Sequence, residues 1–245
     1  MDPLYISATL QDSGKTSFMC GLMQSLRTGH GMDVGYIKPV GQRYVLYQGE
    51  KVDKDAAFMR DVFGLDDPPG RMSPVIIERG FTERYIFNRD AATLEARIIA
   101  CADALAKKHQ ALLVEGTGHA GVGSCIDLSN ARVAHLLGAR VIIIAAGGIG
   151  RPIDEVALSL SLFRDHGVEV LGVVLNKVLP EKYDRIKKAV AKGLEHLGTR
   201  LLGAIPVIPA LICASDAPEG NNRAAQAGPG VPPADRERIK TAADV

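Results

Sequence analysis

Short apolar runs alternate with segments of helical periodicity along about the first 200 residues of the chain. Six runs have the length of a buried strand: residues 4–6, 34–38, 111–114, 139–146, 168–175 and 201–204. Helices are predicted between them, over residues 18–26, 56–63, 91–107, 130–137, 152–166 and 181–197. Strands that alternate with helices form a parallel sheet covered on both faces. The pattern therefore predicts an α/β fold of three layers with a mostly parallel central sheet.

The domain organisation follows from the turns and from a change in composition. The turns between the predicted elements are short, so we expect one domain over residues 1–209. Residues 214–245 consist mainly of Ala, Pro, Gly, Asp and Arg, with almost no large apolar side chain. Such a segment cannot bury enough surface to offset the entropy lost on ordering. We predict a low-complexity, disordered C-terminal tail over residues 210–245.

The first apolar run leads into a loop that closes on a small, polar motif. The motif consists of Ser13, Gly14, Lys15, Thr16 and Ser17, and a helical segment follows it. Strand, loop and helix in this order are the context of a phosphate-binding loop, where backbone N–H groups and a helix N-terminus bind an anion. We expect Lys15 to reach the outer phosphates of a nucleotide and the Thr16 hydroxyl to bind Mg²⁺. Thr9 stands where the usual motif has its leading glycine. The expected fold is thus of the P-loop NTPase type.

Composition excludes several classes of protein. The 29 basic and 28 acidic residues give a net charge of +1, and no Trp is present, so no nucleic-acid partner is expected. The longest apolar run, residues 141–146, is too short to span a membrane, and the N-terminus enters a strand without room for a signal peptide. The four cysteines have no CxxC spacing. They indicate reduced thiols in a cytoplasmic protein, with neither disulfides nor a zinc site.

Three carboxylates are candidates for a metal site. Glu115 ends a buried strand and is followed by a glycine-rich loop. Ligands of open α/β sheets bind beyond this edge, so Glu115 is a candidate for Mg²⁺, the alternative being a strand-end residue that enters solvent. Asp53 and Asp55 open a helix, where acids either bind a metal or interact with the helix dipole.

Two residues at strand ends are candidates for nucleotide contacts. Lys38 is held in an extended geometry by Pro39 and points toward the same edge as the loop, unless it is a surface lysine. Asn176 ends a late strand, where an amide can contact a base. Guanine recognition usually requires an Asp at the position that Leu179 occupies here. Adenine, or no contact with the base, is therefore expected.

Two further positions leave their roles open. Arg151 lies in a glycine-rich turn before a helix, which suits either an anion pocket or a packing or subunit contact. His119 lies in the loop after Glu115, where it is either a catalytic group or a solvated side chain.

Several blocks of the chain together resemble the dethiobiotin synthetase-like branch of P-loop proteins. The blocks are residues 13–16, Tyr36-Ile-Lys-Pro-Val40, Asp53-Lys-Asp-Ala56 and Val114-Glu-Gly-Thr-Gly118, with Gly172-Val-Val-Leu-Asn176 and Gly203-Ala-Ile-Pro206 in support. They cover residues 1 to about 209. The closest similarity is to the nucleotide-binding domain at the N-terminus of some phosphotransacetylases and to its stand-alone relatives.

The resemblance implies ATP and Mg²⁺ as cofactors and assigns roles by position. Lys15 and Lys38 would act on the phosphates as catalytic residues. Thr16, Asp55 and Glu115 would surround Mg²⁺, and Asn176 would lie near the adenine. The resemblance also implies a homodimer that acts on a small-molecule acceptor.

The reaction implied is an ATP-dependent ligase-type phosphorylation of a carboxylate or carbamate to a mixed anhydride. The family's loop normally begins Gly-Thr with an acid next, whereas this chain has Ala8, Thr9 and Leu10, which leaves the diamine substrate open. A nucleotide-sensing regulatory module is the alternative, and a plain α/β protein with a vestigial loop is a third. Leu10 also replaces the extra lysine of the partition and septum-site ATPases, so we do not expect one of these.

Overall fold

A six-stranded sheet forms the centre of the molecule. The computed structural model describes residues 2–209; the predicted tail over residues 210–245 lies outside the described residues. The strands, in spatial order, are β10 (Leu201–Pro206), β9 (Val170–Val178), β8 (Arg140–Ala146), β1 (Leu4–Ala8), β7 (Ala111–Glu115) and β2 (Val34–Ile37). All neighbours in this sheet run parallel. Each of the six predicted strands is confirmed, and the sheet is entirely rather than mostly parallel.

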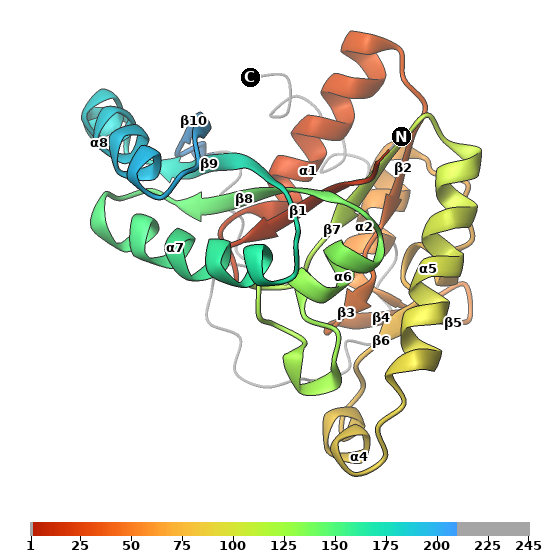
Figure 1. Cartoon of the computed structure of the whole chain (residues 1–245). Coiled ribbons are helices and arrows are strands. Elements are labelled where there is room, and N and C mark those ends of the chain that lie inside the picture. Colours follow the sequence, from red (N-terminus) through yellow and green to blue (C-terminus); the bar gives the residue numbers. More distant parts are fainter. Residues whose placement is uncertain (1, 210–245) are drawn as a thin grey trace.

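Helices cover both faces of the sheet, which gives the three layers predicted (Figure 1). The helices that match predicted segments are α1 (Lys15–Gln24), α2 (Lys54–Phe63), α5 (Ala91–Lys108), α6 (Asn130–Leu136), α7 (Gly150–Asp165) and α8 (Tyr183–His196). Successive strand residues face opposite layers: Tyr5 belongs to the hydrophobic cluster that includes side chains of α5, α7 and α8, and Ile6 belongs to the cluster that includes those of α1 and α2. No helix within residues 2–209 has the length and apolar character needed to cross a membrane.

The segment between β2 and α5 contains elements that the hydrophobic pattern did not predict. These are β3 (Val40–Gly41), β4 (Tyr44–Tyr47), β5 (Glu50–Asp53), α3 (Pro69–Met72), β6 (Val75–Ile76) and α4 (Phe81–Phe87). β4 and β5 form an antiparallel hairpin, and β3 pairs in parallel with β6. β3 and β6 have two residues each, which is too short to show the alternation of apolar and polar residues that marks a strand. The hairpin matters for the site, because it delivers Asp53 to the start of α2.

Short connecting helices complete the fold. They are the π-helical turn η1 (Ser25–Gly29) and the 3₁₀ turns η2 (Ser124–Ile126) and η3 (Pro180–Lys182). The end of β9 differs from the predicted strand end, and this difference affects the site. β9 continues to Val178, so Asn176 lies within the strand and not at its end as predicted. The strand is longer because it pairs on both sides, with β8 at Asn176 and with β10 at Val178.

Candidate functional site

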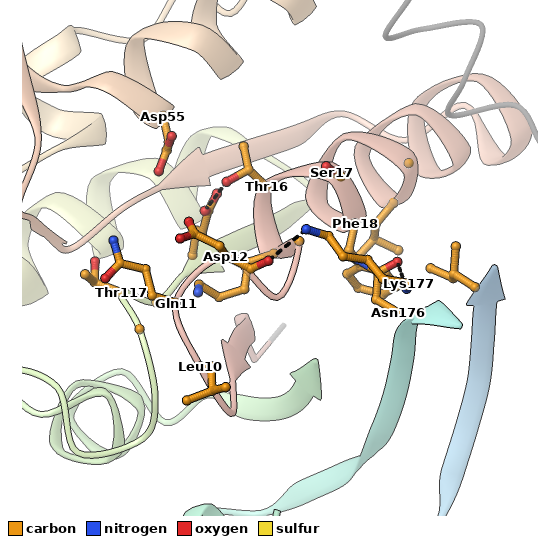
Figure 2. Close-up of a pocket in the computed structure, with 18 of the residues that line it drawn as sticks. Leu10, Gln11, Asp12, Thr16, Ser17, Phe18, Asp55, Thr117, Asn176 and Lys177 are labelled. Atoms are coloured by element: carbon orange, nitrogen blue, oxygen red, sulfur yellow. Dashed lines mark hydrogen bonds between the residues drawn. The ribbon is translucent and has the colours of Figure 1, made fainter. Parts of the chain in front are cut away.

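A cavity of about 1200 Å³ opens at the carboxyl edge of the sheet. Its walls come from the β1–α1 loop, the ends of β2, β7 and β9, the start of α2, and the segment after β10. The predicted residues that line it are Gly14, Lys15, Thr16, Ser17, Lys38, Asp55, Glu115 and Asn176. Figure 2 shows Thr16 and Asp55 on one side of the cavity, with Asn176 and Lys177 on the other. The structure thus brings these predicted residues to one place, and their assigned roles stay predictions.

The phosphate loop is held from behind by the end of β9. The Asn176 amide donates to the Ser13 carbonyl at 2.9 Å, and the Lys177 ammonium donates to the Asp12 carbonyl at 3.1 Å. Gly14 adopts the left-handed conformation (φ 87°) directly before α1. A Cβ at Gly14 would lie 2.0 Å from the Asn176 amide nitrogen, so only glycine allows this close approach. The Asn176 amide predicted to contact a base therefore also fixes the loop.

Lys15 is a buried cation at the first position of α1. Its side chain is 8% exposed and lines the cavity. It has no hydrogen bond or ion pair to any residue in the described part of the chain. Burial lowers the pKa of Lys15 below its ordinary value, although attraction to Glu115 opposes this shift. An anion in the cavity would supply the partner that this ammonium lacks.

Glu115 lies buried at the end of β7, and each of its carboxylate oxygens accepts a hydrogen bond. Its Oε1 accepts a hydrogen bond of 2.8 Å from the Thr16 hydroxyl, and its Oε2 accepts one of 2.8 Å from the Tyr36 hydroxyl. Burial raises the pKa of Glu115, and the neighbouring charge of Lys38 offsets only part of this rise. Burial raises the pKa of the Tyr36 hydroxyl well above its usual range, so that Tyr36 remains a donor to the carboxylate.

Lys38 lies among three carboxylates. Its ammonium is hydrogen-bonded to Asp55 and lies 3.3 Å from Asp53 Oδ1 and 3.7 Å from Glu115 Oε1. Burial alone would lower the pKa of Lys38, but attraction to Asp55, Glu115 and Asp53 raises it above the ordinary value. Burial likewise works to raise the pKa of Asp55, and the ammonium of Lys38 holds it below its usual range. The prediction that Lys38 points to this edge is confirmed, and the surface-lysine alternative is wrong.

The oxygen donors beside Lys38 fit a magnesium ion. The predicted ligands supply one hydroxyl, from Thr16, and two carboxylates, from Asp55 and Glu115, and Mg²⁺ prefers such hard oxygens. Residues 2–209 contain no group of three or more His, Cys, Asp or Glu side chains arranged to hold a metal by themselves. Mg²⁺ commonly keeps several waters and takes further oxygens from substrate phosphates. The donor set therefore suits a metal that arrives with a nucleotide.

The two residues with open roles lie in different environments. His119 lines the cavity, and its Nδ1 lies 3.2 Å from the Gly121 backbone nitrogen, which donates to it. Arg151 forms a 2.6 Å ion pair with Glu155, one turn along α7, and its side chain is 75% exposed. His119 is thus placed to contact a ligand, whereas Arg151 is engaged on the surface of its own helix.

Sequence reasoning missed two residues that support the site. Tyr36 lies two positions before Lys38, and strand alternation puts both on one face, which could have indicated its contact with Glu115. Asn130 holds the glycine-rich loop after Glu115: its amide donates to the carbonyls of Thr117 and His119 at 2.7 and 2.5 Å. Its Oδ1 accepts from the Tyr5 hydroxyl at 2.7 Å and from the Thr117 backbone at 3.0 Å. Nothing local in the sequence indicates this role.

Replacement of Asn130 by alanine is expected to destabilise the protein markedly. The Asn130→Ala variant removes four hydrogen bonds, one buried and three partly buried, and we expect its free energy of unfolding to fall by about 2–4 kcal/mol. Urea unfolding measures this change. Asn88→Ala is the matched control, because Asn88 is exposed and its side chain, within residues 2–209, bonds only to the Arg84 carbonyl. Equal stability of the two variants would contradict this role of Asn130.

The fold and the loop together define a P-loop ATP-binding domain. The chain belongs to the AAA domain family AAA_26, whose model matches residues 2–215. Nucleotide binding follows from membership of this P-loop family.

Curated relatives of the chain include dethiobiotin synthetases. The chain is 29% identical over 182 residues to the ATP-dependent dethiobiotin synthetase of Anaeromyxobacter dehalogenans (strain 2CP-C), with 74% of this chain and 79% of that protein covered. It is 26% identical over 207 residues to the Bacillus cereus (strain B4264) enzyme, with 84% of each covered. The predicted relationship to dethiobiotin synthetase is confirmed. The closer similarity to the phosphotransacetylase domain stays a prediction.

Solved structures with the same fold include cell-division and partition proteins. The MinC:MinD complex of Aquifex aeolicus matches with a TM-score of 0.55 at 14% identity, over 86% of this chain and 84% of that chain. A plasmid partition protein from Borrelia burgdorferi matches with a TM-score of 0.51 at 11% identity, over 84% and 91%. These matches confirm the predicted fold and bear on the fold alone. The distinction from partition ATPases drawn from Leu10 stays a prediction.

Proposed function

We propose that this protein is an Mg-ATP-dependent enzyme of the ligase type, which phosphorylates the carboxylate or carbamate of a small-molecule acceptor. The observation that carries this proposal is the buried Lys15 ammonium, which faces the cavity without a hydrogen-bond or ion-pair partner among residues 2–209. Lys38 and three carboxylates lie beside it. The kinship with dethiobiotin synthetases supports ATP as the nucleotide.

The cavity offers a place for each part of ATP. The triphosphate lies along the loop, with its outer phosphates near Lys15. The cavity continues between Phe18 and Leu22 on α1 and the end of β10, where Ile205 in the strand and Val207 after it supply apolar surface for a planar base. Asn176 lies beside this part of the cavity, and the exposed Leu179 offers no carboxylate for guanine.

Each residue near the phosphates has a separate task in the proposed reaction. Thr16, Asp55 and Glu115 would hold Mg²⁺, which neutralises the charge on the phosphates. Lys15 and Lys38 stabilise the negative charge that develops on the transferred phosphoryl group. Tyr36 fixes one carboxylate oxygen of Glu115, so that the other faces the cavity. The loop held by Asn130 carries Thr117 and His119, which line the cavity and would face the acceptor.

The direct test is the release of ADP from Mg-ATP, with and without a diamino acid plus bicarbonate. We expect release to be stimulated by this pair, lost with a chelator and restored by Mg²⁺. Glu115→Gln is expected to lower turnover by about 10²-fold, because it weakens the metal site. Glu195→Gln is the matched control and should leave turnover unchanged, because it changes an exposed carboxylate on α8 whose ion-pair partner is Lys192.

A nucleotide sensor is the second candidate, and one observation favours it. Leu10 lines the cavity at the position where the resembled family carries an acid. A sensor would bind Mg-ATP saturably and release no ADP with any acceptor. That result would contradict the proposed enzyme activity and favour the sensor.

A further inference from the structure

The environment of Lys38 differs from what a phosphate-binding lysine alone requires. Its side chain is only 7% exposed, and it contacts three carboxylates, of which Asp53 and Glu115 are each 1% exposed. Lys15, by contrast, has no such partner within the described residues. One ammonium therefore offsets part of the negative charge of the three acids around it.

The Lys38 ammonium and the Thr16 hydroxyl contact carboxylate oxygens of Asp55 and Glu115 that a metal would use. Asp55 Oδ2 accepts a hydrogen bond from the Lys38 ammonium. Glu115 Oε1 lies 3.7 Å from that ammonium and also accepts from the Thr16 hydroxyl at 2.8 Å. Asp55 Oδ2 and Glu115 Oε1, two of the carboxylate oxygens that a metal would use, thus already have partners within the protein. A divalent cation that entered this cluster would meet a positive charge already in place.

We propose that Lys38 is a built-in counter-ion that occupies the metal site until a nucleotide binds. In the free protein its ammonium holds Asp53, Asp55 and Glu115 together and excludes Mg²⁺. With a nucleotide bound, its phosphates would offer Lys38 a new anionic partner, and Asp55 and Glu115 would then be free to hold Mg²⁺. Metal binding therefore depends on the nucleotide. This inference rests on the proposed Mg-nucleotide function of the site.

The backbone confines this exchange to the side chain. The Lys38 backbone N–H donates to the Met72 carbonyl at 2.8 Å, and Pro39 follows it directly. Asp53 is equally fixed, because its Oδ1 caps α2 by accepting from the Asp55 N–H at 2.9 Å. Only the flexible stem of Lys38 can carry its charge from the carboxylates toward the phosphate loop, and the carboxylates and the loop line the same cavity.

The test compares the response of the nucleotide-free protein to Mg²⁺ in wild type and in Lys38→Met. Calorimetric titration with MgCl₂ alone gives the affinity, and thermal unfolding gives the stability. We expect wild type to respond weakly to Mg²⁺ alone and strongly to Mg-ADP. Lys38→Met should unfold at a lower temperature without metal, recover with Mg²⁺ alone, and bind free Mg²⁺ at least about tenfold more tightly than wild type. Neither readout involves turnover.

Lys54→Met is the matched control. Lys54 lines the same cavity and precedes Asp55; within the described residues its side chain forms no hydrogen bond or ion pair with the three carboxylates, and its charge only adds to the lowering of the Asp55 pKa. Its response to Mg²⁺ alone should equal that of wild type. A Lys54→Met response equal to that of Lys38→Met would overturn the inference, because any nearby positive charge would then suffice.

Three further results would overturn the inference or the proposed function. Tight binding of Mg²⁺ alone to wild type would overturn the inference, and this measurement needs no variant to fold. Equal affinity of wild type and Lys38→Met for free Mg²⁺ would also overturn the inference. If both proteins still bound Mg-ADP, the proposed nucleotide function would stand. Absence of Mg-ADP binding by wild type would instead overturn the proposed function, and the counter-ion role with it.

Discussion

Lys15→Met is expected to abolish nucleotide binding without loss of stability. The ammonium of Lys15 is buried and lacks a hydrogen-bond or ion-pair partner among residues 2–209. The desolvation of this charge therefore destabilises the ligand-free protein. Methionine keeps the length and the apolar stem of the side chain but removes this charge. We expect ATP turnover to fall by about 10³-fold. The free energy of unfolding of the ligand-free protein should stay the same or rise by about 1 kcal/mol.

Two measurements on the same samples check this expectation. Titration calorimetry with Mg-ATP reports binding, and urea unfolding reports stability. Lys107→Met is the control, because Lys107 is exposed in the last turn of α5, remote from the cavity lining. A loss of several kcal/mol of stability in Lys15→Met would show that the lysine supports the fold, which would contradict a role in ligand binding alone.

Gly14→Ala is expected to damage both the loop and the end of β9. The left-handed backbone at φ 87° costs a non-glycine residue about 1–2 kcal/mol. The new methyl group would also lie 2.0 Å from the Asn176 amide nitrogen, which must move and lose its hydrogen bond to the Ser13 carbonyl. Together these effects should lower the free energy of unfolding by about 2–4 kcal/mol and weaken nucleotide binding by about 100-fold.

The steric and conformational parts of this effect can be separated. Gly138→Ala is the matched control, since Gly138 is also left-handed (φ 56°) but an added methyl group meets no atom within 4 Å. It should cost only about 1–2 kcal/mol, the conformational part. In a double-mutant cycle, Asn176→Ala should cost less in the Gly14→Ala background than in wild type, because the clash is relieved. Additive costs would contradict the proposed contact.

The central fold could be predicted because its signals are local. Residues 139–146 and 111–114 are uninterrupted apolar runs, which in an α/β pattern mark strands buried on both faces. The helix over residues 91–107 showed a clear 3.6-residue period and ends within one residue of its predicted boundary. The hairpin of β4 and β5 escaped prediction because Tyr44–Tyr47 and Glu50–Asp53 lie outside the sheet and have no buried alternating face.

The candidate site could be predicted only in part. Position at a strand end pointed to Glu115 and Lys38, because parallel strands present their carboxyl ends at one edge. Their mutual contact could not be predicted, and neither could the contact of Asp53, a candidate for the metal or the helix dipole, with Lys38. Asn176 was expected at the end of its strand for base recognition. Its hydrogen bond to Ser13 depends on the register between β9 and the loop, which no local pattern encodes.

The sequence by itself determined the order of strand, phosphate loop and helix, the number of central strands and the residue types available at their ends. These follow from periodicity and from the chemistry of residues 13–17, both of which act over a few positions. Only the tertiary structure decided which side chains meet. Thr16 and Glu115 are 99 positions apart and share a hydrogen bond, and Lys38 lies among three carboxylates. Such contacts arise because the parallel sheet sets the register of distant strands, and burial then forces their charges to pair.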